Sequence, residues 1–147
     1  MFLSNINITG SILAIDYGIK RLGLAVSDPM RKFALPLGVI DNKNTSFVLE
    51  EIEKLIQEKN VDLIIVGMPL NMDGSESKMS LLVEKFLEHI NKKLNIKVET
   101  VDERLSSFAA EENLKERDFN SKKIKRYVDT EAARLMLEEY ISVKLNN

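Results

Sequence analysis

The sequence of 147 residues contains no cysteine, no tryptophan and a single histidine, and these absences restrict its chemistry. Without cysteine there is neither a disulfide nor a thiolate metal site. One histidine is too few for a zinc site of the H-E-x-x-H type. Any metal that the chain holds must therefore be bound by oxygen ligands, which favours Mg²⁺ or Mn²⁺.

Long apolar runs are absent as well. No stretch approaches the roughly 20 apolar residues of a membrane-spanning helix, and the N-terminal MFLSNINITG lacks the basic start of a signal peptide. We therefore expect a cytoplasmic protein with no membrane partner. The net charge of −2 argues mildly against nucleic-acid binding as a class. The remaining composition is that of a globular chain, and its length predicts one domain over residues 1–147.

The order of apolar patterns predicts an α/β fold with a mixed five-stranded sheet flanked by helices. Three strands in succession, at 11–17, 22–28 and 33–40, favour an antiparallel meander, and Pro36 favours an edge position for the third. Two later strands alternate with helical patterns, so we expect them to lie parallel to the first strand. These later elements are strands at 61–67 and 96–101 and helices at 46–59 and about 76–94, 105–116 and 130–144.

Acidic residues lie near the carboxyl ends of the strands predicted to be parallel, where ligands bind in such sheets. Asp16 ends the first strand in ILAIDYGIKRLGLAVSD, Asp102 and Glu103 follow the last strand, and Asp129 opens the last predicted helix. Each also has a structural interpretation, as a turn residue, a solvated charge near a helix start or an N-cap. Small residues at 132–133 would let the last helix approach the sheet and bring Asp129 toward Asp16.

Such a cluster of carboxylates predicts a bound cation. Three carboxylates within about 5 Å of one another would repel by about 3 kcal/mol per pair at an effective dielectric constant near 20. A divalent ion would remove that repulsion. Two Mg²⁺ or Mn²⁺ ions held about 4 Å apart could clamp the attacking water and the leaving oxygen of a phosphodiester.

Basic residues accompany these carboxylates. Lys20 and Arg21 follow the first strand, and the stretch NSKKIKRYVD brings Lys123 and Arg126 just before Asp129. By itself that stretch is typical of a solvated loop, but beside an acidic metal site it predicts a grip on backbone phosphates. The loop GMPLNMDGS precedes a helix, whose N-terminus attracts phosphate, and it is also compatible with a simple turn at Asp73-Gly74.

Four stretches, DYGIKRLGLAVSDP, GMPLNMDGS, DERLSS and VDTEAARLMLEEYI, resemble the YqgF family of RuvC-like Holliday junction resolvases, also described as pre-16S rRNA nucleases. They cover nearly the whole chain in the right order. The resemblance implies an RNase H-like fold and Mg²⁺-dependent hydrolysis during maturation of the 5′ end of 16S rRNA, with precursor rRNA and ribosomal particles as partners. It implies catalytic and metal-binding roles for Asp16, Glu103 and Asp129. The accessory residues that it implies are Lys20, Arg21, Asn71 and Arg104.

The chain departs from the family pattern at one turn. Where such sequences often carry a glycine after Ser-Asp-Pro-x, this chain has Arg31-Lys32. We expect this change to alter the turn between the second and third strands and to add charge. It leaves the acidic residues intact, so it should affect substrate contact more than chemistry.

Several alternatives remain open at the level of sequence. A DNA junction is a possible substrate in place of rRNA, and a junction resolvase would need a symmetric dimer, so both monomer and homodimer are considered. A non-catalytic ribosome-assembly factor that binds rRNA is a second alternative. A nucleotide-binding domain related to sugar kinases would also place D-x-G on a first strand, but it needs a second lobe for which we expect no room in this chain.

Overall fold

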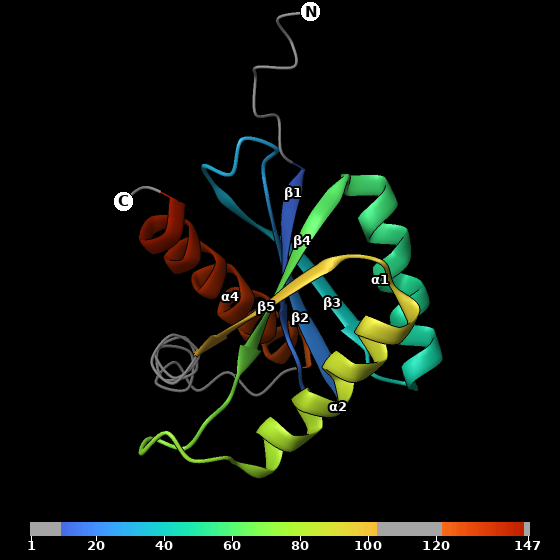
Figure 1. Cartoon of the computed structure of the whole chain (residues 1–147), viewed down its shortest axis with the longest axis vertical. Helices are drawn as coiled ribbons and strands as arrows, with labels where there is room; N and C mark the ends of the chain where they lie inside the picture. The colour runs from blue at the N-terminus through green and yellow to red at the C-terminus, as the bar shows by residue number, and fades with distance from the viewer. Residues whose placement is uncertain (1–9, 103–121, 146–147) are drawn as a thin grey trace, which may run out of the picture.

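The computed structural model describes residues 10–102 and 122–145, except for the side chains of 122–124. Its strands form one sheet in the order β3-β2-β1-β4-β5 (Figure 1). β2 pairs antiparallel with β1 and β3, whereas β4 pairs in parallel with β1 and β5. The predicted mixed sheet is confirmed, and Pro36 lies on an edge strand. The strands are β1 (Ser11–Asp16), β2 (Arg21–Ser27), β3 (Ala34–Asp41), β4 (Val61–Met68) and β5 (Lys97–Asp102).

Helices cover both faces of the sheet. Figure 1 shows α1 (Thr45–Lys59) and α2 (Lys78–Lys93) on one face and α4 (Lys122–Tyr140) crossing the other. A π-helical extension, Ile141–Leu145, continues α4. Each face has its own apolar core, and the alternation of β1 divides its side chains between them. Leu13 and Ile15 belong to the core beneath α1 and α2, whereas Ile12 and Ala14 belong to the core beneath α4.

Local side-chain caps fix the ends of the two helices on the first face. Asn44 accepts a hydrogen bond from the backbone N–H of Phe47 and begins α1 as its N-cap. Asn60 ends α1 in a left-handed conformation with φ of 52°. Ser77 and Ser80 form a reciprocal capping box at the start of α2. These caps define where the loops after β3 and β4 leave the sheet.

The last helix begins earlier than the sequence predicts. We expected it from about residue 130, with Asp129 at its opening, but α4 begins at Lys122. Asp129 therefore lies inside the helix, and 122–128 is not a loop. Lys and Arg are good helix formers, and Arg126 pairs with Asp41 on the sheet, so tertiary contact extends the helix beyond its apolar stripe. The helix predicted at 105–116 lies outside the described residues.

The helices that the structure describes were compared with the requirements of a membrane span. None of them combines the length and the apolar character that a bilayer span requires.

Candidate active site

Asp16 and Asp129 approach each other across a glycine. Asp16 pairs with Gly23 of β2, and a Cβ atom on Gly23 would lie only 2.0 Å from the carbonyl oxygen of Asp129. Asp16 continues the alternation of Ile12 and Ala14, so its side chain faces α4. The first strand and the last helix therefore place these two aspartates on the same face of the sheet, each next to Gly23.

An arginine engages the second of these aspartates. Arg21 Nε donates a hydrogen bond of 2.6 Å to Asp129 Oδ2, and the two side chains are 17% and 26% exposed. Arg21 and Gly23 lie on the same face of β2 because they are two residues apart. One oxygen of Asp129 is thus engaged by a cation. Its other oxygen is the one that a divalent ion could approach without displacing Arg21.

A second ion pair fixes the neighbouring turn of α4. Arg126 Nη2 donates to Asp41 Oδ1 at 3.0 Å and to Oδ2 at 3.3 Å, and Asp41 pairs with Arg21 across β2 and β3. Thr130 Oγ1 also donates to the carbonyl oxygen of Gly38 at 3.1 Å. Arg126, expected to bind substrate, therefore also anchors α4 to β3.

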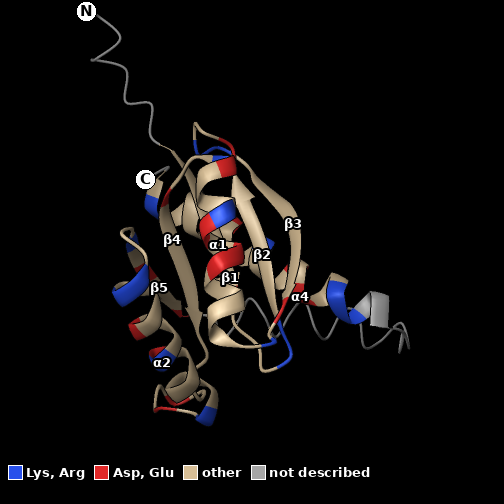
Figure 2. Ribbon diagram, turned by 90° about the vertical axis from the view of Figure 1, so that its right-hand side faces the viewer, with Lys and Arg blue, Asp and Glu red and all other residues tan. Residues whose placement is uncertain are grey.

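Asn42 fixes the backbone of the turn between β1 and β2. Asn42 donates from Nδ2 to the carbonyl oxygen of Gly18 and from its backbone N–H to that of Lys20, both at 2.9 Å. Gly18 is required because a Cβ atom there would lie 2.5 Å from the carbonyl oxygen of Arg21. Lys20 is exposed at the end of this turn. An exposed cation thus stands on a turn whose backbone is fixed. Figure 2 shows Lys and Arg both on this turn and on the first turns of α4.

The loop after β4 forms a compact turn before α2. The backbone N–H of Gly74 donates to the carbonyl oxygen of Asn71 at 2.8 Å, and Gly74 has φ of 87°. Asn71 Nδ2 donates to Ser75 Oγ and to the carbonyl oxygen of Glu76, both at 3.0 Å. A turn is therefore present, and it begins at Asn71. The side chain of Asn71, expected to contact substrate, holds the loop together in this structure.

Three expected site residues cannot be placed. Glu103 and Arg104 lie outside the described residues, and the structure describes Lys123 only as a backbone position in α4. Asp102 is exposed at the end of β5, where it pairs with Met68. Within residues 10–102 and 122–145, no three acidic or histidine side chains form a group that could hold a metal ion. The described part of the site is thus the pair Asp16 and Asp129 with Arg21.

Comparison with known proteins identifies the family. The model of the RuvX family, described as "Holliday junction resolvase", matches residues 10–143. This chain belongs to the RuvX family. That result confirms the resemblance to YqgF proteins inferred from the motifs.

Curated relatives match along nearly their whole length. A "Putative pre-16S rRNA nuclease" of Maridesulfovibrio salexigens is 36% identical over 131 residues, covering 89% of this chain and 97% of the relative. A protein of the same description from Clostridioides difficile is 38% identical over 138 residues, covering 94% of this chain and 98% of the relative.

Solved resolvases share the fold. Thermus thermophilus RuvC in complex with a Holliday junction superposes with a TM-score of 0.56 at 12% identity, covering 92% of this chain and 96% of RuvC. The Fowlpox virus resolvase bound to junction DNA also gives 0.56, at 14% identity, covering 92% and 99%. The RuvX chain therefore has the RNase H-like fold that its motifs implied.

The turn that departs from the family pattern lies at the other end of the RuvX sheet. Arg31, in a left-handed conformation with φ of 56°, pairs with Asp62 and donates from Nε to the carbonyl oxygen of Gly10 at 3.1 Å. These partners stand where β1 and β4 begin, opposite the end occupied by Asp16. The charge of Arg31 thus joins the β2–β3 loop to the start of the parallel strands.

Sequence reasoning missed Gly23. Its role is to leave space for the backbone of Asp129, and a residue without a functional group does not stand out in a search for catalytic side chains. One signal was present: Gly23 interrupts the apolar stretch LGLAV immediately after Arg21. Glycine within a strand often marks a place where another backbone approaches closely.

Proposed function

We propose that this chain is a metal-dependent endonuclease that hydrolyses phosphodiester bonds of structured nucleic acid, and that its substrate is the 5′ end of pre-16S rRNA. The observation that supports the proposal is the approach of the Asp129 backbone to Gly23, the strand partner of Asp16, together with the hydrogen bond from Arg21 to Asp129. The names of the curated relatives support rRNA as the substrate. Such a substrate would be met in the cytoplasm, on ribosomal particles.

The donor atoms fit a hard divalent cation. Asp16 and Asp129 offer carboxylate oxygens, which Mg²⁺ and Mn²⁺ prefer, and we include Glu103 as the third ligand. Glu103 lies outside the described residues and enters the proposal from the family resemblance. The described part of β5 contacts the same helix as Asp129, because Glu99 accepts a hydrogen bond from Tyr140 of α4 and Val101 packs against the core beneath α4. One or two ions would supply Lewis-acid polarisation of the scissile phosphate and a water of lowered pKa.

The protein's own cations complete the proposed chemistry. Arg21 fixes the orientation of Asp129 through their hydrogen bond, so this carboxylate is preorganised before substrate binds. Lys20, exposed on the braced turn, is placed to bind a phosphate oxygen and to neutralise charge that develops during cleavage. Arg104, Lys123 and Arg126 are proposed contacts to neighbouring phosphates, with Asn71 holding the loop after β4.

The test is cleavage of defined substrates. Purified protein is incubated with precursor rRNA and with a four-way DNA junction, each with Mg²⁺ and with chelator. We expect Mg²⁺-dependent cleavage of the rRNA, and a loss of at least about 100-fold in rate for Asp16→Asn and for Asp129→Asn. Glu53→Gln, an exposed carboxylate-to-amide change on α1, is the matched control and should cleave normally. An Asp16→Asn protein that cleaves at the wild-type rate would refute the site.

Junction resolution is the second candidate. It is favoured by the description of the RuvX family model and by the two junction-bound resolvases of the same fold. Symmetric cleavage of two strands requires a two-fold dimer. The same assay distinguishes the candidates, because a resolvase cuts the four-way junction and sediments as a dimer. Binding of precursor rRNA without any cleavage would favour the non-catalytic assembly role.

A further inference from the structure

A groove runs between the edge strand β3 and the flank of helix α4 that faces it. Its larger part has a volume of about 710 Å³ and is lined by Pro36 and Val39 of β3 and by Arg126, Tyr127 and Thr130 of α4, among others. Thr130 follows Asp129 directly in the chain. The groove is also linked to the site through its lining, because Arg126 bonds Asp41, the strand partner of Arg21.

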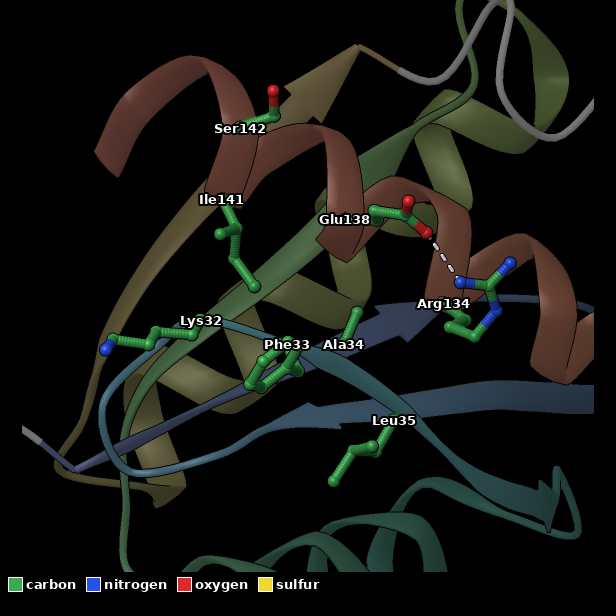
Figure 3. Close-up of a pocket in the computed structure, with 8 residues that line it drawn as sticks. All are labelled: Lys32, Phe33, Ala34, Leu35, Arg134, Glu138, Ile141 and Ser142. Carbon is green, nitrogen blue, oxygen red and sulfur yellow. Dashed lines mark hydrogen bonds and ion pairs between the residues drawn. The ribbon is translucent and has the colours of Figure 1, made fainter. Parts of the chain in front are cut away.

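A second hollow extends this groove along the same strand and helix. Its volume is about 430 Å³, and Arg134 lines both parts. Figure 3 shows Ala34 and Ile141 on opposite walls, Glu138 joined to Arg134 along the helix, and Phe33 near the end of the groove. Figure 3 also shows Leu35 pointing away from the helix, so that side chain does not fill the groove.

Exposed aromatic rings and cations occupy this surface together. Tyr127 is 57% exposed and Phe33 is 64% exposed, although both are large enough to form core. Arg126 and Lys32 lie directly beside them in the chain. The carboxylates of Glu131 and Glu138 both pair with Arg134, at 2.6 and 2.5 Å, so one of their two negative charges is compensated within the groove. Rings for stacking next to cations for phosphates are the combination that single-stranded nucleic acid requires.

The backbone of β3 disfavours a protein strand as occupant. Pro36 has no N–H to donate to an added strand, and the pairing of β3 with β2 shifts register beside it. Gly38, with φ of 126°, breaks the extended conformation two residues later. Such features protect a sheet edge from pairing with another chain.

We propose that the groove between β3 and α4 carries the unpaired strand of the nucleic-acid substrate as it leaves the carboxylate pair, with one base stacked on Tyr127 and another on Phe33. This inference rests on the proposed function, because it assumes a nucleic-acid substrate. It adds a path for the strand and two residues that position it. Stacking is tolerant of sequence, so the groove holds any unpaired strand, whereas the cleaved position is set elsewhere.

The test measures binding without cleavage. A fluorescein-labelled single-stranded RNA of about 12 nucleotides is titrated with protein in chelator, and the Kd is read from anisotropy. We expect Tyr127→Ala to weaken binding by about fivefold or more, Phe33→Ala to do likewise, and Tyr127→Phe to restore it, because the ring and not the hydroxyl makes the contact. Leu81→Ala removes a comparably exposed apolar side chain from α2, on the other face, and should leave the Kd within about twofold.

Photo-crosslinking locates the contact directly. Single-stranded RNA containing 5-iodouridine should crosslink to the peptide that contains Tyr127, and duplex RNA should not. A Tyr127→Ala protein that binds as tightly as wild type, or crosslinks only outside the groove, would overturn the proposal. So would a dimer in sedimentation velocity that Tyr127→Ala dissolves, because a second copy would then fill the groove. Loss of cleavage in Asp16→Asn tests the nuclease separately, since the binding assay needs no metal.

Discussion

The carbonyl oxygen of Asp129 lies 2.0 Å from the position that a Cβ atom on Gly23 would occupy. Helix α4 can therefore rest on β2 only because residue 23 has no side chain. Asp16 pairs with Gly23 on the neighbouring strand, so the contact that seats the helix also sets the separation of the two aspartates. Packing and chemistry depend on the same glycine.

Replacing Gly23 with alanine should lower both the stability of the fold and the rate of cleavage. The added methyl group meets helix backbone, which cannot move aside as a flexible side chain would, so α4 must shift. We expect a loss of about 1–3 kcal/mol in the free energy of unfolding, measured with urea. Cleavage should fall further than stability explains, because Asp129 is displaced from Asp16.

Gly38→Ala is the matched control for this effect. A Cβ atom on Gly38 meets nothing within 4 Å, but φ there is 126°, so alanine is strained by the backbone alone. Gly38→Ala should therefore lose stability without driving a methyl group against α4, so its folded fraction should lose less cleavage than that of Gly23→Ala. Equal cleavage by the two variants at equal folded fraction would contradict the role assigned to Gly23.

The ion pair of Arg21 and Asp129 should be measurable in a double-mutant cycle. The variants Arg21→Ala and Asp129→Asn, singly and together, give the coupling in the free energy of unfolding. We expect about 1 kcal/mol, the upper end for exposed pairs, because both side chains are mostly buried. The pair Lys54 and Glu51, at 3.6 Å on the open surface of α1, should give less than about 0.5 kcal/mol. Equal couplings would show that burial adds nothing to the Arg21 pair.

The sheet and most helices could be predicted from sequence because periodicity reports burial directly. The alternation of β1 and the helical stripe of α1 are local consequences of which side chains enter the core. The start of α4 could not be predicted in this way. Its first turns carry charged residues without an apolar stripe, and Arg126 is held there by Asp41, which lies 85 positions earlier in the chain. A long-range ion pair leaves no periodic signal.

The positions of the candidate site residues were predictable only in part. Strand ends in a parallel sheet share one edge, so the placement of Asp16 and Asp102 at that edge follows from topology. The engagement of Asp129 by Arg21 does not follow, because it depends on where α4 crosses β2. Asn71 is expected from the motif to contact substrate, and the structure adds a role that the motif does not indicate, because its side chain bonds Ser75 and Glu76 of its own loop.

Asp28 should make stability depend on pH in the acid range. Partial burial raises the pKa of Asp28, but hydrogen bonds from the backbone N–H groups of Phe33, Lys32 and Met30 outweigh it and hold that pKa below the ordinary value of 3.8. The unfolded chain therefore binds the proton more readily, so this contribution is present above the unfolded pKa and is lost as pH falls through the folded one.

Asp28→Asn tests this dependence. Urea unfolding from about pH 6 down to about pH 3 should show wild type and variant converging as the solution becomes more acidic. At the upper end of this range the variant should be less stable by about 1 kcal/mol, because its amide replaces a charged acceptor of three hydrogen bonds. A difference that stays constant over the whole range would show that protonation of Asp28 is not linked to folding.

Asn60 offers a stabilising substitution away from the candidate site. Its φ of 52° lies in the left-handed region, its N–H caps the carbonyl oxygen of Ile56, and its own carbonyl oxygen accepts from Ser11 at the start of β1. Glycine adopts this conformation without steric cost, so Asn60→Gly should raise the free energy of unfolding by about 0.5 kcal/mol, whereas Asn60→Ala should lower it by about 1 kcal/mol. The same exchange to glycine at Asn91, within α2, should be destabilising because glycine weakens a right-handed helix. Urea unfolding of the three variants tests this prediction. If glycine changes the free energy of unfolding in the same direction at Asn60 and at Asn91, the left-handed cap does not limit the stability of the α1–β4 connection.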